Sequence, residues 1–273
     1  MSLQGTNRPI GVFDSGVGGL TVFEAVQREL PDEPLIYLGD TARVPYGTRS
    51  AETVVRYSLE AARFLRRHEI KLLVVACNTA SSVALEPLAE VARVPAVGVI
   101  LPGARRAVEL SASGRIGVIG TRATIASGAY REGIRSMRPD AEVLSRPCPL
   151  FVPLAEEGWM DDEVAERVAA RYLEPLRASG VDTLVLGCTH YPLLREVIAK
   201  TMGPGVRLVD SAESVAREVG ERLRVEPELA AAGRSTPAQH RFFVTDAPEP
   251  FQQVAERFLR RPIERLECAE VCA

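Results

Sequence analysis

The chain has 273 residues, of which 46% are hydrophobic and 25% charged, as in an average globular protein. This composition excludes a disordered chain and a collagen-like one. With 33 basic against 36 acidic residues the net charge is −3, and no basic run is longer than two residues, which argues against nucleic acid as a partner.

Neither a membrane segment nor a disulfide scaffold is expected. No apolar run approaches the roughly 18–20 residues that a membrane-spanning helix needs, and no apolar stretch follows a basic start at the N-terminus, so no secretory signal is predicted. The chain has five cysteines, an odd number, and they lack the spacing of a disulfide framework. Without Cys-x-x-Cys or His-x-x-x-His pairs, no metal site is predicted either. We therefore expect a cytoplasmic protein that contacts no membrane.

Short apolar runs alternate with amphipathic stretches along the chain, a pattern typical of parallel sheets that are covered by helices on both faces. The fold class predicted is therefore α/β. The predicted strands cover residues 10–13, 35–38, 72–76, 116–119, 141–144, 183–186, 206–209 and 241–244. The predicted helices cover residues 51–67, 124–137, 162–178 and 214–223, with a further one near Val254.

Two segments of the sequence recur at nearly the same interval. Residues 10–14 read IGVFD and residues 116–120 read IGVIG, while residues 73–79 read LVVACNT and residues 184–190 read LVLGCTH. Two unrelated motifs that repeat together indicate two similar α/β domains with mainly parallel sheets, which we expect to face each other across a cleft. The first domain is predicted to span residues 1–100 and to be completed by residues 210–273, and the second to span residues 101–209.

Each copy of the second motif places a cysteine between a strand and a helix. Cys77 and Cys188 are thus predicted at the carboxyl ends of strands, where parallel sheets bind ligands. Unpaired backbone N–H groups and the positive end of a helix dipole lower a thiol pKa from about 8.5. One such cysteine alone is better explained as a small buried hydrophobic residue. Two cysteines at corresponding places of the repeated motif indicate a functional role for both.

Two thiols from facing domains suit the inversion of a stereocentre, because one base can remove a proton from a carbon while the other returns it on the opposite face. A cysteine hydrolase, the alternative from another reaction class, needs one thiol and a histidine such as His190. Lys71 and Lys200 both lie away from the predicted strand tips, so no Schiff base to pyridoxal phosphate is expected. Residues 14–19, DSGVGG, lack the third glycine of a dinucleotide site, where Thr21 stands, but suit a carboxylate at a helix start. No cofactor is expected.

Over residues 9–246 the chain resembles the glutamate racemases of the cofactor-independent aspartate/glutamate racemase superfamily. The resemblance rests on FDSGVGGL at 13–20, GDTARVPYG at 39–47, CNTA at 77–80 and GCTHYP at 187–192. It implies racemisation of glutamate to supply D-glutamate for peptidoglycan, with Cys77 and Cys188 as the catalytic thiols. It also implies substrate contacts from Asp14, Ser15, Tyr46, Gly47, Asn78, Thr79, Thr189 and His190. Aspartate racemase is the alternative within the superfamily, and we expect a homodimer.

The α-proton of glutamate is far less acidic than a thiol, so the site must stabilise a developing carbanion with oriented donors. Side chains and backbone N–H groups at four positions are the candidates for holding the α-carboxylate: Ser15, Asn78, Thr79 and Thr189. Thr121 ends the second domain's first strand, at roughly the place of Ser15, and is a further binding candidate.

For three residues the sequence leaves an alternative open. Asp14 is either a helix N-cap or a catalytic group near Cys77 and the substrate ammonium. His190 is either an ordinary loop histidine or assists proton movement at Cys188. Tyr46, in a turn between Pro45 and Gly47, either packs or contacts substrate together with its neighbours.

The remaining cysteines receive no catalytic role. Cys148 stands between two prolines and is expected to be structural. Cys268 and Cys272 are expected to lie in a frayed C-terminal tail.

Overall fold

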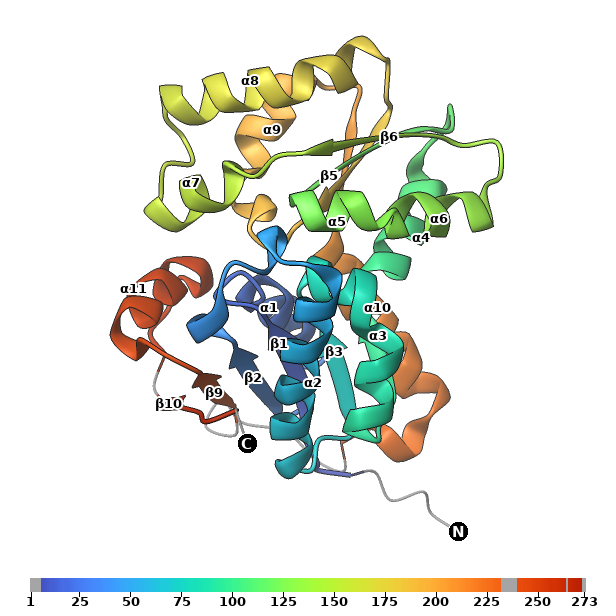
Figure 1. The fold of residues 1–273 in the computed structure, drawn as a ribbon. Coiled ribbons are helices and arrows are strands. Elements are labelled where there is room, and N and C mark those ends of the chain that lie inside the picture. The colour runs from blue at the N-terminus through green and yellow to red at the C-terminus, as the bar shows by residue number, and fades with distance from the viewer. Residues whose placement is uncertain (1–5, 232–239, 264, 272–273) are drawn as a thin grey trace.

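The computed structural model describes residues 6–231, 240–263 and 265–271. They form two units, one above the other in Figure 1, each built on a parallel sheet with helices on both faces. The first sheet has the strand order β10-β9-β2-β1-β3-β4. Its strands are β1 (Ile10–Asp14), β2 (Leu35–Gly39), β3 (Leu72–Val75), β4 (Ala96–Gly98), β9 (Arg241–Val244) and β10 (Leu266–Cys268).

The second sheet has the order β6-β5-β7-β8, with β5 (Arg115–Gly120), β6 (Glu142–Pro147), β7 (Thr183–Gly187) and β8 (Arg207–Asp210). Its order repeats that of β2-β1-β3-β4, so that β5 corresponds to β1 and β7 to β3. These are the strands that carry the two repeated motifs. The predicted α/β fold with two similar parallel-sheet units is confirmed, while the domain boundaries at residues 100 and 210 stay a prediction.

The helices that follow these strands cover both faces of each sheet. The first sheet is covered by α1 (Leu20–Glu29), α10 (Ser211–Val225) and α11 (Pro248–Leu259) on one face, and by α2 (Ala51–Arg67) and α3 (Asn78–Ala92) on the other. The second is covered by α4 (Ile100–Leu110) and α6 (Ala129–Met137) on one face, and by α7 (Phe151–Glu157), α8 (Glu163–Ala178) and α9 (Arg195–Met202) on the other.

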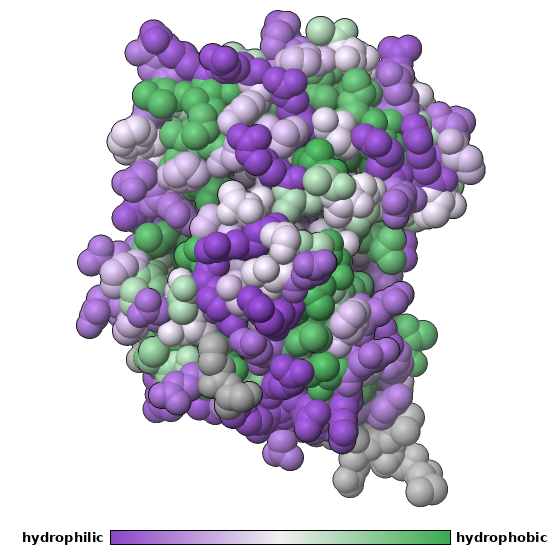
Figure 2. Space-filling model, viewed as in Figure 1, coloured by the Kyte–Doolittle hydropathy of each residue, from purple (hydrophilic) through white to green (hydrophobic). Residues whose placement is uncertain are grey.

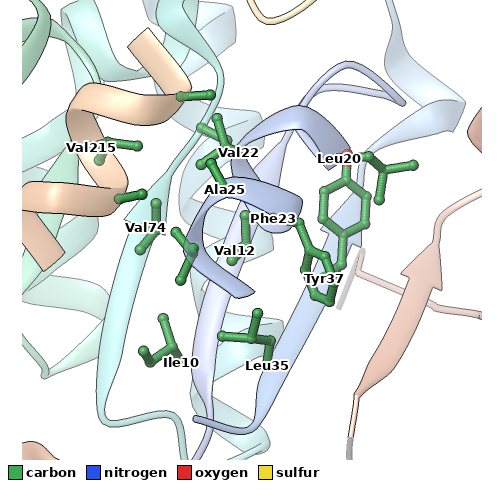
Figure 3. Packing of buried hydrophobic residues seen from close by; sticks show 14 of the residues in the cluster. Ile10, Val12, Leu20, Val22, Phe23, Ala25, Leu35, Tyr37, Val74 and Val215 are labelled. Atoms are coloured by element: carbon green, nitrogen blue, oxygen red, sulfur yellow. The ribbon is translucent and has the colours of Figure 1, made fainter. Parts of the chain in front are cut away.

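Continuous hydrophobic strands follow from this two-sided cover, because successive side chains of a strand point to opposite faces. Figure 3 shows one face, where Val12 and Val74 of neighbouring strands lie beneath Phe23 of α1 and Val215 of α10. All four side chains are fully buried. Burial of each contributes about 1.5–3 kcal/mol relative to exposure.

The structure corrects two sequence predictions and adds two strands. The helix expected at residues 124–137 is interrupted at Gly128, whose φ of +73° separates α5 (Arg122–Ser127) from α6; a left-handed residue ends a helix, and glycine adopts that conformation without strain. The three-residue strands β4 and β10 were too short to be predicted. Because β10 pairs with β9, Cys268 lies in a strand and not in a frayed tail; Cys272 lies outside the described residues.

The outer surface carries both hydrophilic and apolar residues. On the face shown in Figure 2, hydrophilic residues prevail along the lower part and apolar residues occur in scattered groups. Within the described part of the chain, no helix combines the length and the hydropathy needed to cross a bilayer.

Candidate active site

A pocket of about 340 Å³ lies between the two units, where the segments after β1, β3, β5 and β7 meet. Its volume is within the roughly 300–1,000 Å³ typical of small-ligand sites. In both sheets the strand order reverses at this point, between β1 and β3 and between β5 and β7, which is where doubly wound sheets bind ligands. The sequence-predicted residues that line the pocket are Ser15, Pro45, Tyr46, Gly47, Cys77, Asn78, Thr79, Thr121, Cys188, Thr189 and His190.

Cys77 follows β3 and is the N-cap residue of α3. Its Sγ accepts a hydrogen bond from the backbone N–H of Ala80 at 3.5 Å and donates one to Ser15 Oγ at 3.4 Å. Burial, together with the negative charge of Asp14, raises the pKa of Cys77 to about 12, although both hydrogen bonds oppose this rise. The predicted contact with the helix N-terminus is present, but the predicted lowering of the Cys77 pKa is wrong, because burial outweighs it.

Asp14 is the one predicted site residue that lies behind the pocket wall and does not line it. Its carboxylate is 1% exposed; Oδ2 accepts a hydrogen bond from Gly16 N at 2.9 Å, and Oδ1 has no partner. Burial raises its pKa, which the charge of His190 partly opposes. The N-cap alternative is wrong, since α1 begins after Gly19 without a side-chain cap.

At the second thiol, a histidine and a carboxylate form a chain of contacts. His190 Nδ1 lies 3.9 Å from Cys188 Sγ, and Nε2 lies 2.8 Å from Oε1 of Glu156 on α7. Burial lowers the pKa of His190, but the contacts with Cys188 and Glu156 outweigh burial and raise it to about 10. His190 is therefore a cation at neutral pH, held between a thiol and a carboxylate.

Helix α11, from the C-terminal part of the chain, covers this histidine. The ring of Phe258 contacts the imidazole of His190 edge-on with centroids 5.6 Å apart. Arg257 donates a hydrogen bond to the backbone carbonyl of Glu156 at 3.0 Å. One helix packed on the first sheet thus supports both the histidine and its carboxylate partner in the second unit.

Polar groups from both units meet on the wall between the thiols. Asn78 Oδ1 accepts a hydrogen bond from Tyr130 at 2.7 Å, while its Nδ2 is buried and unpartnered. The hydroxyls of Thr79, Thr121 and Thr124 lie within 3.0–3.1 Å of one another. A buried unpaired donor is costly, so Asn78 Nδ2 marks a place where a ligand acceptor would be stabilised.

Tyr46 both packs and lines the pocket, so the packing alternative is confirmed, while its contact with substrate stays a prediction. Its ring contacts Phe13 and Tyr57, and its hydroxyl donates to Asp40. That hydroxyl is therefore already engaged within the protein. The neighbouring Gly47 lets this loop approach Thr121, since a Cβ there would lie 2.7 Å from Thr121 Cβ.

The model of the Asp/Glu/hydantoin racemase family matches residues 10–219. The chain belongs to this family. A glutamate racemase of Geobacter metallireducens is 59% identical over 252 residues, which cover 92% of this chain and 93% of that protein. The predicted resemblance to glutamate racemases and the predicted enzyme class, an isomerase, are thereby confirmed.

Solved structures of glutamate racemases share the fold over almost the whole chain. The Francisella tularensis enzyme in complex with D-glutamate is 39% identical, with a TM-score of 0.90 and coverage of 97% of this chain and 98% of that one. The Thermus thermophilus enzyme in complex with β-chloro-D-alanine is 47% identical, with a TM-score of 0.86 and coverage of 96% and 97%.

In this racemase neither lysine lines the pocket. Lys71 is fully buried at the amino end of β3, where it pairs with Glu33, and Lys200 pairs with Glu166 on the surface at 2.5 Å. Cys148 is buried in the core of the second unit, and its carbonyl accepts a hydrogen bond from Tyr191.

The sequence analysis missed Glu156 and Arg122, which also line the pocket. Arg122 directly follows Thr121 and is the only lysine or arginine among the described lining residues; its place after a strand end was a usable signal. No sequence signal pointed to Glu156, because it lies 34 residues before His190 on a helix that the apolar pattern did not reveal.

Proposed function

We propose that this racemase interconverts L- and D-glutamate by moving a proton between two thiols on opposite sides of the α-carbon. One observation carries the proposal: Cys77 and Cys188, at equivalent strand ends of two similar units, line the same small pocket. A hydrolase would need one thiol only. The relatives named as glutamate racemases, one of them with D-glutamate bound, support glutamate as the substrate.

The unpaired groups of the pocket match an α-amino acid. The carboxylate of Asp14, directly behind the pocket wall, attracts an ammonium through its negative charge, and the partnerless Nδ2 of Asn78 in the wall itself donates to a carboxylate. Hydroxyls and N–H groups at Ser15 and Thr189 add donors to the α-carboxylate, where they stabilise the charge that develops on deprotonation. The cationic Arg122 and the threonine hydroxyls suit the second carboxylate of glutamate.

The two thiols take different roles in the first step. Because burial and Asp14 keep the pKa of Cys77 near 12, Cys77 carries its proton at neutral pH and serves first as the acid. Cys188 acts as the base, taking the α-proton on its face, with the protonated His190 at 3.9 Å. Cys77 then gives its proton to the opposite face of the carbanion, which inverts the centre. The reverse direction exchanges the two roles.

The decisive experiment is racemisation of L-glutamate in D₂O without added cofactor. We expect optical rotation to decay as deuterium enters the α-position, with L-aspartate converted far more slowly. Chelator and hydroxylamine treatment should leave the rate unchanged. A strict requirement for pyridoxal phosphate, or faster turnover of aspartate, would contradict the proposal.

Replacing Glu156 should change the pH profile through His190. Glu156→Gln removes one of the contacts that raise the His190 pKa to about 10, so His190 loses its proton at lower pH. The alkaline limb of kcat/KM should therefore move down by about one unit or more. Glu157→Gln, which removes the same charge from the exposed next residue, is the matched control. An alkaline limb at the same pH in Glu156→Gln would show that Glu156 does not support the His190 charge.

We further propose that the product supplies peptidoglycan synthesis and that the enzyme acts in the cytoplasm. The described cysteines Cys77, Cys148, Cys188 and Cys268 are all free thiols, as suits a reducing compartment. The homodimer expected from the sequence stays a prediction.

A further inference from the structure

Tyr130, on α6 of the second unit, lies between the two thiol-bearing segments. Its side chain is 3% exposed, and its hydroxyl donates to Asn78 Oδ1 at 2.7 Å. Asn78 begins α3 of the first unit and directly follows Cys77. The hydrogen bond therefore links the two units beside the first thiol; α3 and α6 are neighbours in Figure 1.

The ring of Tyr130 occupies a slot between two glycines. A Cβ at Gly187 would lie 3.0 Å from ring atom Cε2, and a Cβ at Gly103 would lie 3.2 Å from Cε1. Gly187 ends β7 and directly precedes Cys188. One side chain thus contacts the residue after the first thiol and the residue before the second.

The hydroxyl of Tyr130 determines which end of the Asn78 amide is free. An amide carries an acceptor at one end and donors at the other. With Oδ1 engaged by Tyr130, the buried Nδ2 remains as an unpartnered donor. Burial raises the pKa of Tyr130 far above its ordinary value, so the phenol stays protonated and can donate at any pH at which the enzyme works.

We propose that Tyr130 is a positioning residue for the racemase reaction: its hydroxyl holds the Asn78 amide with Nδ2 toward the substrate, and its ring sets the spacing of the Cys77 and Cys188 segments. This inference rests on the proposed function and adds a residue outside the pocket lining. The hydroxyl and the ring of Tyr130 have different effects. The hydroxyl acts on substrate binding through Asn78, and the ring acts on proton transfer through the spacing of the thiols.

The hydroxyl is tested by a double-mutant cycle with Tyr130→Phe and Asn78→Ala. Loss of the hydrogen bond to Asn78 should lower kcat/KM about tenfold, mainly through KM. In the Asn78→Ala background, Tyr130→Phe should cost nothing further, because the amide it orients is gone. Tyr172→Phe, which removes a hydroxyl that contacts Leu150 N in the same unit, is the matched control and should behave as wild type.

The ring is tested by Tyr130→Leu, which empties part of the slot between the glycines. Misplaced reacting groups lose orders of magnitude in rate, so kcat should fall about tenfold or more below that of Tyr130→Phe. If the kcat of Tyr130→Leu were equal to that of Tyr130→Phe, the spacing role of the ring would be overturned. Thermal melting of each variant shows that it is folded at the assay temperature.

Wild-type kinetics in Tyr130→Phe, or an equal penalty in both backgrounds, would overturn the orienting role. Calorimetric titration of all four proteins of the cycle with D-glutamate keeps this outcome separate from the proposed function. If wild type failed to racemise glutamate, the proposed function would fail, while coupling between Tyr130 and Asn78 in D-glutamate binding would still report the contact.

Discussion

Cys77→Ser and Cys188→Ser should each reduce racemisation of glutamate by about 10³-fold or more. A positioned base contributes about 10²–10⁴-fold, and a serine hydroxyl is a far poorer base than a thiol. Neither thiol can replace the other, because each serves one face of the α-carbon. Both variants should fold normally, since serine is close to cysteine in size. Cys268→Ser, at an exposed thiol in β10, is the control and should keep full activity.

A half-reaction that needs one base separates the two thiols. Each variant should still eliminate a good leaving group from the β-carbon of a glutamate analogue, because the surviving thiol can remove the α-proton from its own face. Cys77→Ser and Cys188→Ser should therefore consume opposite enantiomers of the analogue. If both preferred the same enantiomer, or if one kept full racemase activity, the thiols would not act from opposite faces and the single-thiol hydrolase would become the better explanation.

Lys71→Met should lower the free energy of unfolding by about 3–5 kcal/mol, as removal of one partner from a buried ion pair does. Lys71 and Glu33 side chains are 0% and 4% exposed, and Lys71 also donates to Thr6 O at 3.1 Å. Glu33 accepts in addition from Ala231 N at 2.7 Å. Removing the lysine therefore leaves a buried carboxylate whose one remaining partner among the described residues is a backbone N–H. Urea denaturation measures the loss.

Two control variants test whether the loss of stability in Lys71→Met comes from a buried unpaired charge. Lys200→Met breaks the surface pair with Glu166, whose side chains are 71% and 49% exposed, and should cost at most about 1 kcal/mol. The double variant Lys71→Met, Glu33→Leu should recover much of the loss, because no unpaired charge remains. Racemase activity below the unfolding transition should be unchanged in Lys71→Met, since this pair lies at the opposite end of β3 from Cys77. A stability equal to that of Lys200→Met would contradict the buried-pair account.

Several elements followed directly from local pattern. The helix predicted at residues 51–67 is α2 (Ala51–Arg67) to the residue, because its amphipathic period is uninterrupted and Ser50 supplies an N-cap. Strands β1, β2 and β7 followed from continuous apolar runs. The helix at 124–137 failed at Gly128, because a glycine inside an amphipathic pattern does not by itself tell whether the backbone turns left-handed.

The sequence by itself determined the candidate site to a large extent, since strand ends of a parallel sheet meet at one edge wherever the helices pack. The two matching motifs therefore placed Cys77 and Cys188 at equivalent strand ends of their own sheets, and the facing of the two units then brought both thiols to one pocket. Tertiary structure alone decided the remaining chemistry: the burial that raises the Cys77 pKa, the distance from Glu156 to His190, and the contact of Tyr130 with Asn78. These depend on solvent exclusion and on contacts between residues far apart in the chain, and a local pattern of residue types contains neither.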